Sequence, residues 1–293
     1  MNRTPAPRVL SAAGPLPRAR RLAVALAFIA LHPPVAQAQT PAAQAPSTRE
    51  MNLIGWQEFA EMVPGRIETV LIPVGTLEPH GVIPNGADNL APEAMARELA
   101  PRLDALIAPT LNYGVTGALD AFPGTFSIRE EVYAEIVRDI LRGLADGGFV
   151  NLIILNGHGG PQTAILERIA AEVGRERRVR TLVTNWWAAT SEVVFEVFGE
   201  NGGHAGNNET AYVQAIAPEH VHPERYDAAM ASARVPGLSP WPSPSSIVLY
   251  EAGQGYPTFD AEQARRYFEA VNLRMEELIA TTIERWDAAR LFR

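Results

Sequence analysis

Three side chains that can bind a metal or move a proton lie in one short stretch of the sequence: Glu78, His80 and Asp88. They follow the apolar run Thr69–Val74, which is typical of a buried strand, and glycines at positions 75 and 81 flank the first two. Two carboxylates and an imidazole within eleven residues are a dense group in a chain of which 20% of residues are charged. We therefore expect this loop to carry chemistry.

The same combination of histidine, glycine and carboxylate recurs further along the chain. His158 lies in the sequence Asn-Gly-His-Gly-Gly at 156–160, and His204 is followed by Glu209. A single histidine in a loop is more often a hydrogen-bonded structural residue than a ligand. Here, all three histidines outside the N-terminal segment and the Pro-rich stretch near 220 lie beside glycines and near acids. This shared context favours a metal site.

The residue types narrow the choice of metal. The chain has no cysteine, so thiolate ligands are excluded. Two histidines with three carboxylates suit Zn²⁺ or Mn²⁺, and in some proteins Fe²⁺. Five ligands are more than one tetrahedral catalytic site uses, since such a site takes three protein ligands and a water. Two ions about 3.5–4 Å apart, which share a carboxylate and a water, account for the five ligands better.

Alternating strands and helices are expected to position these loops. Apolar runs without polar alternation predict strands buried on both faces, as in a parallel sheet. These runs are Thr69–Val74, Ala105–Ala108, Asn151–Leu155 and Val179–Asn185. Helical patterns cover Pro92–Leu103, Glu130–Leu144, Gln162–Val173, Glu209–Ala217 and Ala261–Arg285. This order predicts an α/β protein, a single three-layer α/β/α domain with a mostly parallel central sheet and ligands beyond the carboxyl ends of its strands.

Boundary signals refine two of the helices and one loop. We expect one helix to begin near Pro92 with Asp88 or Asn89 as its cap, and another to end at Gly174. The stretch Val235–Tyr256 is rich in Pro, Ser and Gly. Because a loop this long is usually functional or part of an interface, we expect a pocket lid or an oligomer arm, with a plain surface loop as the alternative.

Residues 1–38 have the features of a secretory signal peptide. Five arginines and no acid precede the apolar run Leu22–Leu31, and Ala36-Gln37-Ala38 is a small-x-small cleavage signal. Ten apolar residues are too few to span a bilayer, which takes about 20. We therefore expect a periplasmic or secreted protein, cleaved near Ala38 and without a stable membrane anchor. A disordered tail or a membrane anchor is the alternative, and Arg20-Arg21 leaves the twin-arginine route open.

The remaining chain is predicted to be a flexible linker at 39–48 and a folded domain at 49–293. The chain has a net charge of −8, and cleavage would remove five arginines and make it more acidic. Nucleic-acid binding requires clustered Lys and Arg to release counterions, so this composition argues against a nucleic-acid partner.

Several ordered motifs together make the sequence resemble the creatininase (creatinine amidohydrolase) family, over about residues 69–268. These motifs are PVGTLEPHG at 73–81 with the Asp88 loop, FPGT at 122–125, NGHGG at 156–160, HAG at 204–206 with Glu209-Thr210, and GYP at 255–257. The resemblance implies the creatininase fold, a dinuclear metal centre, hydrolysis of an amide C–N bond and a homo-oligomer, a hexamer.

The resemblance also implies a role for each candidate residue. The metal ligands would be Glu78, His80, Asp88, His158 and Glu209, with Asp88 as the bridge between two ions. Some members of the family carry an acid just after the NGH histidine, where this chain has Gly160. His204 matches the histidine that passes a proton to the leaving nitrogen.

The chain departs from many members of the family at two places. Those members carry a second histidine soon after Glu-x-His-Gly, where this chain has Val82-Ile83-Pro84 and a Glu-to-Asp spacing one residue shorter. They also carry Glu-His three residues before Phe-Pro-Gly-Thr, where this chain has Ala118-Leu119. An apolar pocket wall leaves fewer hydrogen bonds for a small polar ring. We therefore expect the reaction type of the family but not creatinine as the substrate.

Three further residues are candidate substrate contacts. Trp186 and Trp187 follow the fourth predicted strand, and Thr125 belongs to the Phe-Pro-Gly-Thr motif. Aromatic walls suit planar amides. For the two tryptophans, core packing or an oligomer contact is the alternative.

The resulting prediction is an exported, metal-dependent amidohydrolase that acts on the C–N bond of a cyclic or linear small-molecule amide, other than a peptide bond. A formamide or peptide-bond hydrolase on the same fold is one alternative, and a non-catalytic periplasmic metal- or solute-binding protein is another. Loss of His204 distinguishes them, because an enzyme would keep its metal and lose turnover, whereas a carrier would lose affinity.

Overall fold

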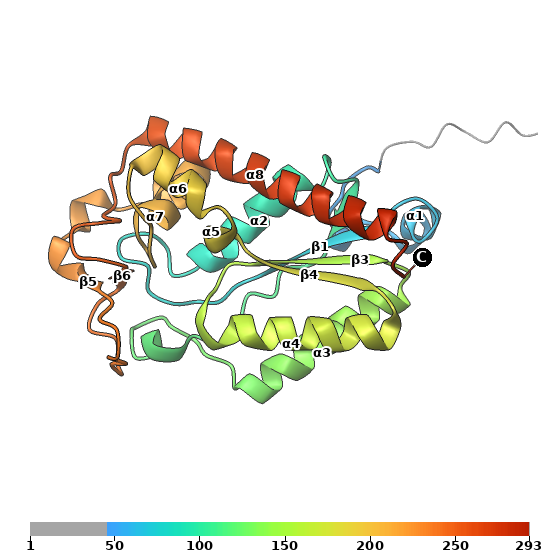
Figure 1. Cartoon of the computed structure of the whole chain (residues 1–293), viewed down its shortest axis with the longest axis horizontal. Helices are drawn as coiled ribbons and strands as arrows, with labels where there is room; N and C mark the ends of the chain where they lie inside the picture. The colour runs from blue at the N-terminus through green and yellow to red at the C-terminus, as the bar shows by residue number, and fades with distance from the viewer. Residues whose placement is uncertain (1–45, 293) are drawn as a thin grey trace, which may run out of the picture. The chain divides into compact units, whose positions relative to one another are not determined.

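The computed structural model describes residues 46–292, and Figure 1 shows how their helices and strands are arranged. The predicted signal peptide lies outside the described residues, and so does most of the predicted linker. Among residues 46–292, no helix combines the length and the apolar character needed to cross a membrane.

A parallel sheet of four strands forms the middle layer. Its strands are β1 (Thr69–Val74), β2 (Ala105–Ile107), β3 (Asn151–Asn156) and β4 (Arg180–Asn185), in the spatial order β2-β1-β3-β4. In the register of the sheet, Val74 pairs with Asn156, and Asn156 pairs with Asn185. The carboxyl ends of β1, β3 and β4 therefore meet at the same edge, and so do the loops that follow them.

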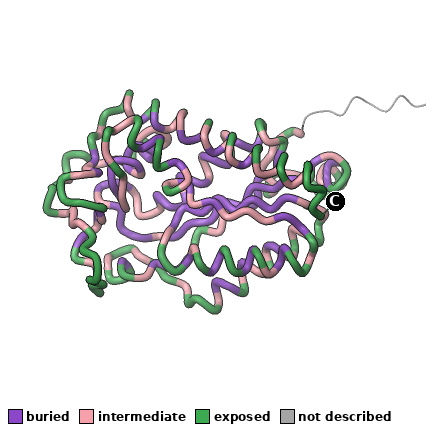
Figure 2. The backbone as a smooth tube through the Cα atoms, viewed as in Figure 1, coloured by how far each residue is buried: buried purple, intermediate pink, exposed green. Residues whose placement is uncertain are grey.

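Helices cover both faces of this sheet (Figure 1). Val70 and Ile72 share one core with α3 (Glu130–Asp146) and α4 (Gly160–Arg177). The alternate residue Leu71 belongs to a second core on the other face, with α2 (Ala87–Leu99) and α8 (Ala261–Ala288). Figure 2 shows burial concentrated along the central strands. The predicted three-layer α/β/α architecture is confirmed.

Shorter elements complete the described chain. The remaining α-helices are α1 (Trp56–Met62), α5 (Trp186–Ala189), α6 (Ser191–Phe198) and α7 (Asn207–Ile216). Single 3₁₀ turns lie at Met51–Leu53, Gly117–Leu119, Pro218–His220, Pro223–Arg225 and Ala228–Met230. A second, two-stranded parallel sheet pairs β5 (Ala231–Ala233) with β6 (Ile247–Leu249). Because β6 lies inside the stretch 235–256, the prediction of a continuous loop there is wrong for these three residues.

Three predicted helix boundaries are also wrong, one of them the predicted end at Leu103, since α2 ends at Leu99. Helix α2 begins at Ala87, so Asp88 lies in its first turn rather than capping it, and Pro92 lies inside the helix. Helix α4 continues past Gly174 and ends at Arg177, and the next residue, Arg178, is left-handed with φ of 56°. A Cβ on Gly174 would lie 3.2 Å from the hydroxyl of Thr181. This glycine therefore allows the helix to pack closely on β4 rather than ending it.

Candidate metal centre

The five predicted ligands converge beyond the carboxyl ends of β1 and β3. Glu78 and His80 come from the loop after β1, Asp88 from the first turn of α2, His158 from the loop after β3 and Glu209 from the first turn of α7. The first four are between 0% and 6% exposed. Parallel strands place their following loops at one edge of the sheet, and this explains why residues 80 positions apart meet.

Two glycines let these loops approach each other. A Cβ on either Gly75 or Gly157 would overlap the backbone carbonyl of Asp88. Proline at position 92 has no N–H to donate to that carbonyl as the next helical turn normally would. The start of α2 is therefore packed directly between the two ligand loops, and this packing brings the Asp88 carboxylate between His80 and His158.

The Asp88 carboxylate faces one histidine with each oxygen. Its Oδ1 lies 2.9 Å from Nε2 of His80, and its Oδ2 lies 2.9 Å from Nδ1 of His158. Oε1 of Glu78 lies 3.0 Å from the same His158 nitrogen, and Oε2 of Glu209 lies 3.6 Å from the His80 nitrogen. Three groups of potential metal ligands result, each with its ligand atoms within 4.8 Å of one another: Glu78–Asp88–His158, His80–Asp88–Glu209 and Glu78–His80–His204. Asp88 belongs to the first two groups, which together contain all five predicted ligands.

Several buried atoms of this cluster make no hydrogen bond. They are both carboxylate oxygens of Glu78 and the Nε2 atoms of His80 and His158. Buried polar groups in folded proteins are nearly always hydrogen-bonded, and buried charges are paired or coordinate a metal. In this part of the chain, the side chains aim lone pairs at one another, and a shared cation between them would satisfy these atoms. The donor set therefore fits a pair of divalent ions.

The tautomer of His80 agrees with a ligand role. Its Nδ1 lies 3.0 Å from the backbone oxygen of Glu78. Because a carbonyl oxygen can only accept, Nδ1 carries a proton, and Nε2 is the nitrogen that faces Asp88 and Glu209 and could bind a metal ion. A histidine ligand is usually oriented in this way through its other nitrogen.

Without a cation, the cluster shifts the pKa values of its members strongly. Burial alone lowers the pKa of His80, but the charges of Asp88, Glu209 and Glu78 outweigh it and raise the pKa to about 10. The pKa of His158 rises for the same reason, against its burial and because of Glu78 and Asp88. Burial raises the pKa of Glu209 to about 7, although His80 acts in the opposite direction. The cluster thus attracts positive charge, which is carried by protons when no metal is bound.

His204 lies against the cluster and is held from two sides. Its Nε2 donates to the backbone oxygen of Pro79 at 2.7 Å, and its Nδ1 lies 3.4 Å from Oε1 of Glu78. Its backbone pairs with Val248 of β6 in both directions, and Ser246 accepts from the backbone N–H of Gly81 at 3.2 Å. Burial, together with the charge of His80, lowers the pKa of His204 to about 3. His204 is therefore neutral near pH 7, and its Nδ1 carries a lone pair that faces the ligands.

The predicted substrate contacts occupy different environments and stay predictions. Trp187 contacts the loop that carries His158, since a Cβ on Gly159 would lie 3.6 Å from its ring. Trp186 is 3% exposed and lies 4.9 Å from the ring of Tyr212, in the surroundings that the core-packing alternative describes. Thr125 lies in a loop whose next residue donates to the backbone of Leu77, and its hydroxyl is buried without a partner.

The sequence predicted that Val82 and Ile83 form an apolar wall of the pocket. For Ile83 this prediction is wrong. Its side chain is 5% exposed and packs in a small core with Ala87, Val213 and Val221. This core lies between α2 and α7, which carry Asp88 and Glu209. The residue at position 83 therefore supports the two helices that bring ligands, rather than lining a substrate pocket.

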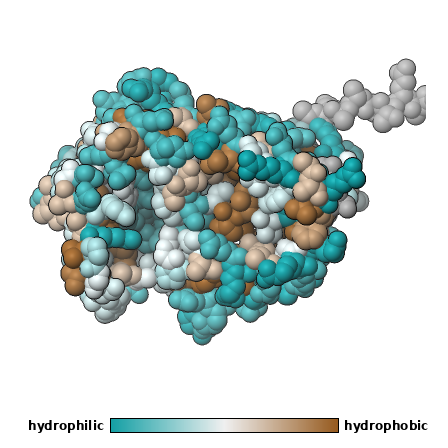
Figure 3. All heavy atoms as spheres, in the orientation of Figure 1, coloured by the Kyte–Doolittle hydropathy of each residue, from teal (hydrophilic) through white to brown (hydrophobic). Residues whose placement is uncertain are grey.

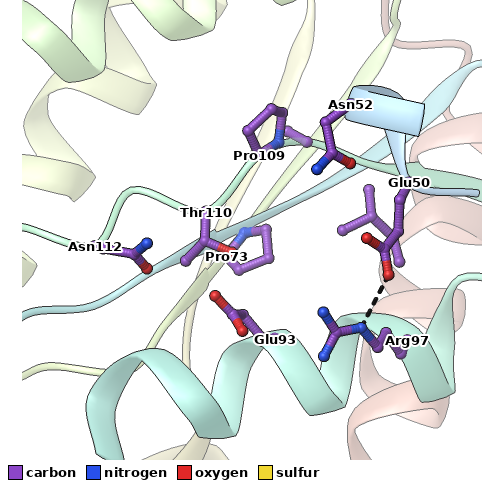
Figure 4. Close-up of a pocket in the computed structure, with 10 residues that line it drawn as sticks. Glu50, Asn52, Pro73, Glu93, Arg97, Pro109, Thr110 and Asn112 are labelled. Atoms are coloured by element: carbon purple, nitrogen blue, oxygen red, sulfur yellow. Dashed lines mark hydrogen bonds and ion pairs between the residues drawn. The ribbon is translucent and has the colours of Figure 1, made fainter. Parts of the chain in front are cut away.

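A separate polar cleft of about 290 Å³ lies beside β2 and α2 (Figure 4). It is lined by Glu50, Asn52, Pro73, Glu93, Arg97, residues 107–110 and Asn112. Arg97 pairs with Glu50 at 3.0 Å at one side of it. Because this cleft contains none of the predicted site residues, we assign the chemistry to the buried cluster.

The model of the creatinine amidohydrolase family matches residues 52–279 of the chain. The chain belongs to the creatininase family. Creatinine amidohydrolase from Pseudomonas putida is 31% identical over 189 residues, which are 58% of this chain and 72% of the relative. The mycofactocin precursor peptide peptidase of Mycobacterium tuberculosis is 28% identical over 228 residues, 72% of this chain and 84% of the relative. The family inferred from the sequence motifs is confirmed.

Solved creatininase structures share the fold. A crystal structure of creatinine amidohydrolase is 24% identical, covers 80% of this chain and 98% of its own, and has a TM-score of 0.70. Similar structures include a creatininase mutant of the Zn–Zn type and a manganese creatininase. This creatininase-family amidohydrolase therefore has the fold of metalloenzymes and groups of residues suited to bind metal.

The sequence left the supports of the ligands unassigned. Gln162 and Asn156 form a buried hydrogen-bonded pair behind His158. The sequence did offer one signal for this support, a glutamine two residues after Gly160 on the buried face of a helix. The backbone contacts of Ser246 and Val248 had no such signal, because any residue type can make them.

Proposed function

We propose that this creatininase-family protein is a two-metal hydrolase that cleaves the C–N bond of a small cyclic or linear amide. The observation that carries the proposal is the position of Asp88, whose two oxygens each lie 2.9 Å from a different histidine. One carboxylate shared by two ligand groups is what a dinuclear centre requires. The proposed ligands are Glu78, His80, Asp88, His158 and Glu209.

The donors in this site are imidazole nitrogens and carboxylate oxygens, which suit Zn²⁺ or Mn²⁺, with Fe²⁺ also compatible. When bound, such ions would polarise the amide carbonyl and lower the pKa of water. The protein would supply a buried cluster rich in carboxylates and fix the ligands through their outer hydrogen bonds, such as that from His80 to the Glu78 carbonyl.

His204 is proposed to move the proton. Its Nε2 is committed to the Pro79 carbonyl, so its Nδ1 is the atom that takes up and returns a proton. The oxygen of water bonds to the carbonyl carbon and the C–N bond breaks. One proton of the water travels through Nδ1 of His204 to the leaving nitrogen, and the acid product takes the oxygen. General acid–base catalysis of this kind contributes about 10²- to 10⁴-fold.

Metal removal and repletion test the proposal. Dialysis against a chelator should abolish amide hydrolysis, and two equivalents of Zn²⁺ or Mn²⁺ per chain should restore it. The Asp88→Ala variant should bind neither ion tightly and should remain inactive after repletion. Full activity in metal-free Asp88→Ala protein would contradict a metal-dependent reaction.

A peptide bond is a second candidate for the scissile bond, since the relative from M. tuberculosis is a peptidase of a precursor peptide and this chain covers 84% of it. A panel of lactams, formamides and short peptides separates the two candidates by kcat/KM. Creatinine belongs in the panel as well. We expect it to be a poor substrate, because this chain lacks the second histidine that many members of the family carry soon after Glu-x-His-Gly, and the stretch Val82-Ile83-Pro84 has no polar side chain to replace it.

Export and self-association complete the proposal. Residues 1–38 are proposed to direct the protein to the periplasm or the medium, which N-terminal sequencing of the mature protein tests. Large apolar side chains are exposed at Trp56 (76%), Trp241 (70%) and Tyr250 (69%). Leu53 and Leu238 are exposed as well, and Figure 3 shows hydrophobic atoms among hydrophilic ones on one face of the molecule. A homo-oligomer, with a hexamer as the family resemblance implies, would cover such side chains, and a mass measurement in solution tests this.

A further inference from the structure

Gln162 is a buried polar residue that none of the proposed catalytic steps uses. It lies near the start of α4, is 0% exposed and uses both ends of its amide. Its Nε2 donates to Oδ1 of Asn156 at 3.0 Å, and its Oε1 accepts from the backbone N–H of Val115 at 3.1 Å. It therefore links the last residue of β3 to a segment far away in the sequence.

On one side, this link reaches the backbone of His158. Oδ1 of Asn156 accepts from the His158 N–H at 3.2 Å, and Nδ2 of Asn156 donates to the His158 carbonyl. The same Nδ2 also donates to Oδ1 of Asn185 at 2.7 Å. Because these bonds use both the nitrogen and the oxygen of the Asn156 amide, that amide cannot rotate to compensate for the loss of Gln162.

On the other side, the link reaches the loop of Glu78. Val115 belongs to the segment 114–128, which is closed by a hydrogen bond of 2.7 Å from Ile128 to Gly114. Within it, Phe126 donates to the backbone oxygen of Leu77 at 3.1 Å, directly before Glu78. A Cβ on Gly114 would overlap Oε1 of Gln162, so the segment can approach Gln162 this closely only with glycine at that position.

We propose that Gln162 is a positioning residue that fixes the spacing between His158 and Glu78 and thereby sets the metal affinity of the Glu78–Asp88–His158 group. The inference rests on the proposed function, because it assumes that these residues bind a metal. Nδ1 of His158 and Oε1 of Glu78 lie 3.0 Å apart although their loops follow different strands. The chain Asn156–Gln162–Val115 connects these two loops through side-chain hydrogen bonds.

Two variants of Gln162 test this role. Gln162→Met keeps the approximate volume and removes both hydrogen bonds. Gln162→Glu keeps the acceptor for Val115 but turns an acceptor toward the Asn156 oxygen. Removal of an outer partner of a metal ligand typically costs about 10- to 100-fold in affinity. We expect that loss for one of two Zn²⁺ equivalents in each variant, measured by competition with a fluorescent chelator and by metal content.

Asn151 supplies a matched control at the opposite end of β3. It is 3% exposed, donates to Oγ1 of Thr69 at 3.1 Å and accepts from Arg180. Asn151→Ala therefore also breaks buried amide hydrogen bonds, and it should lower the melting temperature to an extent similar to Gln162→Met. Its affinity for both Zn²⁺ equivalents should stay within about twofold of the wild-type value, far from the 10-fold expected for a positioning residue.

The outcomes separate the two proposals. If the wild type binds two ions and hydrolyses amides while both Gln162 variants bind Zn²⁺ as tightly as wild type, the positioning role is overturned and the function stands. Loss of folding in both variants would make Gln162 a structural residue and would also overturn it. If the wild type binds no divalent ion, the proposed function fails first and the inference fails with it.

Discussion

The two ends of the central sheet differ in how their buried charged side chains are neutralised. At the amino end, the side chain of Arg180 is 1% exposed and is paired with Asp287 at 2.6 Å. It also donates to the backbone oxygen of Leu291 at 2.7 Å. This charge is therefore neutralised by a residue of the same chain, and the pair ties the end of α8 to the sheet.

At the carboxyl end, three carboxylates lie among histidines, and no Lys or Arg of residues 46–292 forms an ion pair with them. Both oxygens of Glu78 lack a hydrogen bond. The counter-charge that these acids find within residues 46–292 is that of protonated His80 and His158, and in the proposed function a metal ion would replace those protons. At the amino end, a residue of the chain supplies the counter-charge, and the pair stabilises the fold. At the carboxyl end, the counter-charge comes from protons or ions in solution, and this is the end proposed to carry the chemistry.

The largest effect should come from the residue that both ligand groups share. Asp88→Ala should reduce bound Zn²⁺ or Mn²⁺ from two equivalents to none after desalting, and activity should fall with it. The loss should exceed the roughly 10- to 100-fold that outer partners of metal ligands contribute. Metal analysis of the purified variant gives the answer. Retention of two ions would show that Asp88 is not the bridge.

His204→Ala should separate metal binding from turnover. Both equivalents of metal should remain bound, because His204 is a proton carrier in the proposed reaction, while kcat should fall by about 10²- to 10⁴-fold. Steady-state kinetics and metal content on the same sample provide the two readouts. If the wild-type protein shows no hydrolysis and the variant binds metal more weakly, the result would instead support a metal carrier.

Asp287→Ala tests the other end of the sheet. The buried Arg180 would lose its partner, and because Asp287 is 35% exposed, water can partly replace it. We expect the free energy of unfolding to fall by about 2 kcal/mol, less than for a fully buried pair. Urea unfolding measures this loss. Metal content and kcat should be unchanged, and a change in either would mean that the two ends are coupled.

Metal affinity should rise with pH. In the metal-free protein, the pKa of His80 is raised to about 10 and that of Glu209 to about 7. Both groups bind protons at pH 6, and these protons must leave when the ion binds. Affinity should therefore increase at least about tenfold per unit between pH 6 and 8, the value for one displaced proton. Chelator competition across this range checks it, and a flat profile would contradict proton displacement.

The strands of the sheet were predictable because their sequences are apolar on both faces. Thr69–Val74 has the predicted bounds, and the parallel arrangement by itself places the loops after β1 and β3 at one edge. Glu78 and His158 could therefore be grouped before the structure was known. Gly75 and Gly157 could also be picked out in the sequence. That glycine is needed there because the backbone carbonyl of Asp88 packs against both positions could not be predicted.

Features that depend on packing between distant elements could not be predicted from the sequence. Ile83 looked like a pocket residue, but α7 packs over it and makes it core. Gly174 looked like a helix end, but the approach of β4 requires it inside the helix. The position of Glu209 beside His80 came from family resemblance, because eight α-helices and β-strands lie between the loop of His80 and α7.

Two of the loops of the candidate site are held by β6 and the residue before it, through Val248 to His204 and through Ser246 to Gly81. The chain before it, from Arg234 to Ser245, is anchored at its start by a bond from Arg234 to Leu249. It is held again further on, where Trp241 donates to Asp120 at 3.0 Å and Ser243 donates to the backbone oxygen of Ala118 at 2.9 Å. The residues 235–240 between these points are therefore the ones that can vary with the least effect on the ligands. Such a segment is well suited to insertions and grafted sequences, so descendants of one catalyst can diverge in what they accept while the reaction itself is conserved.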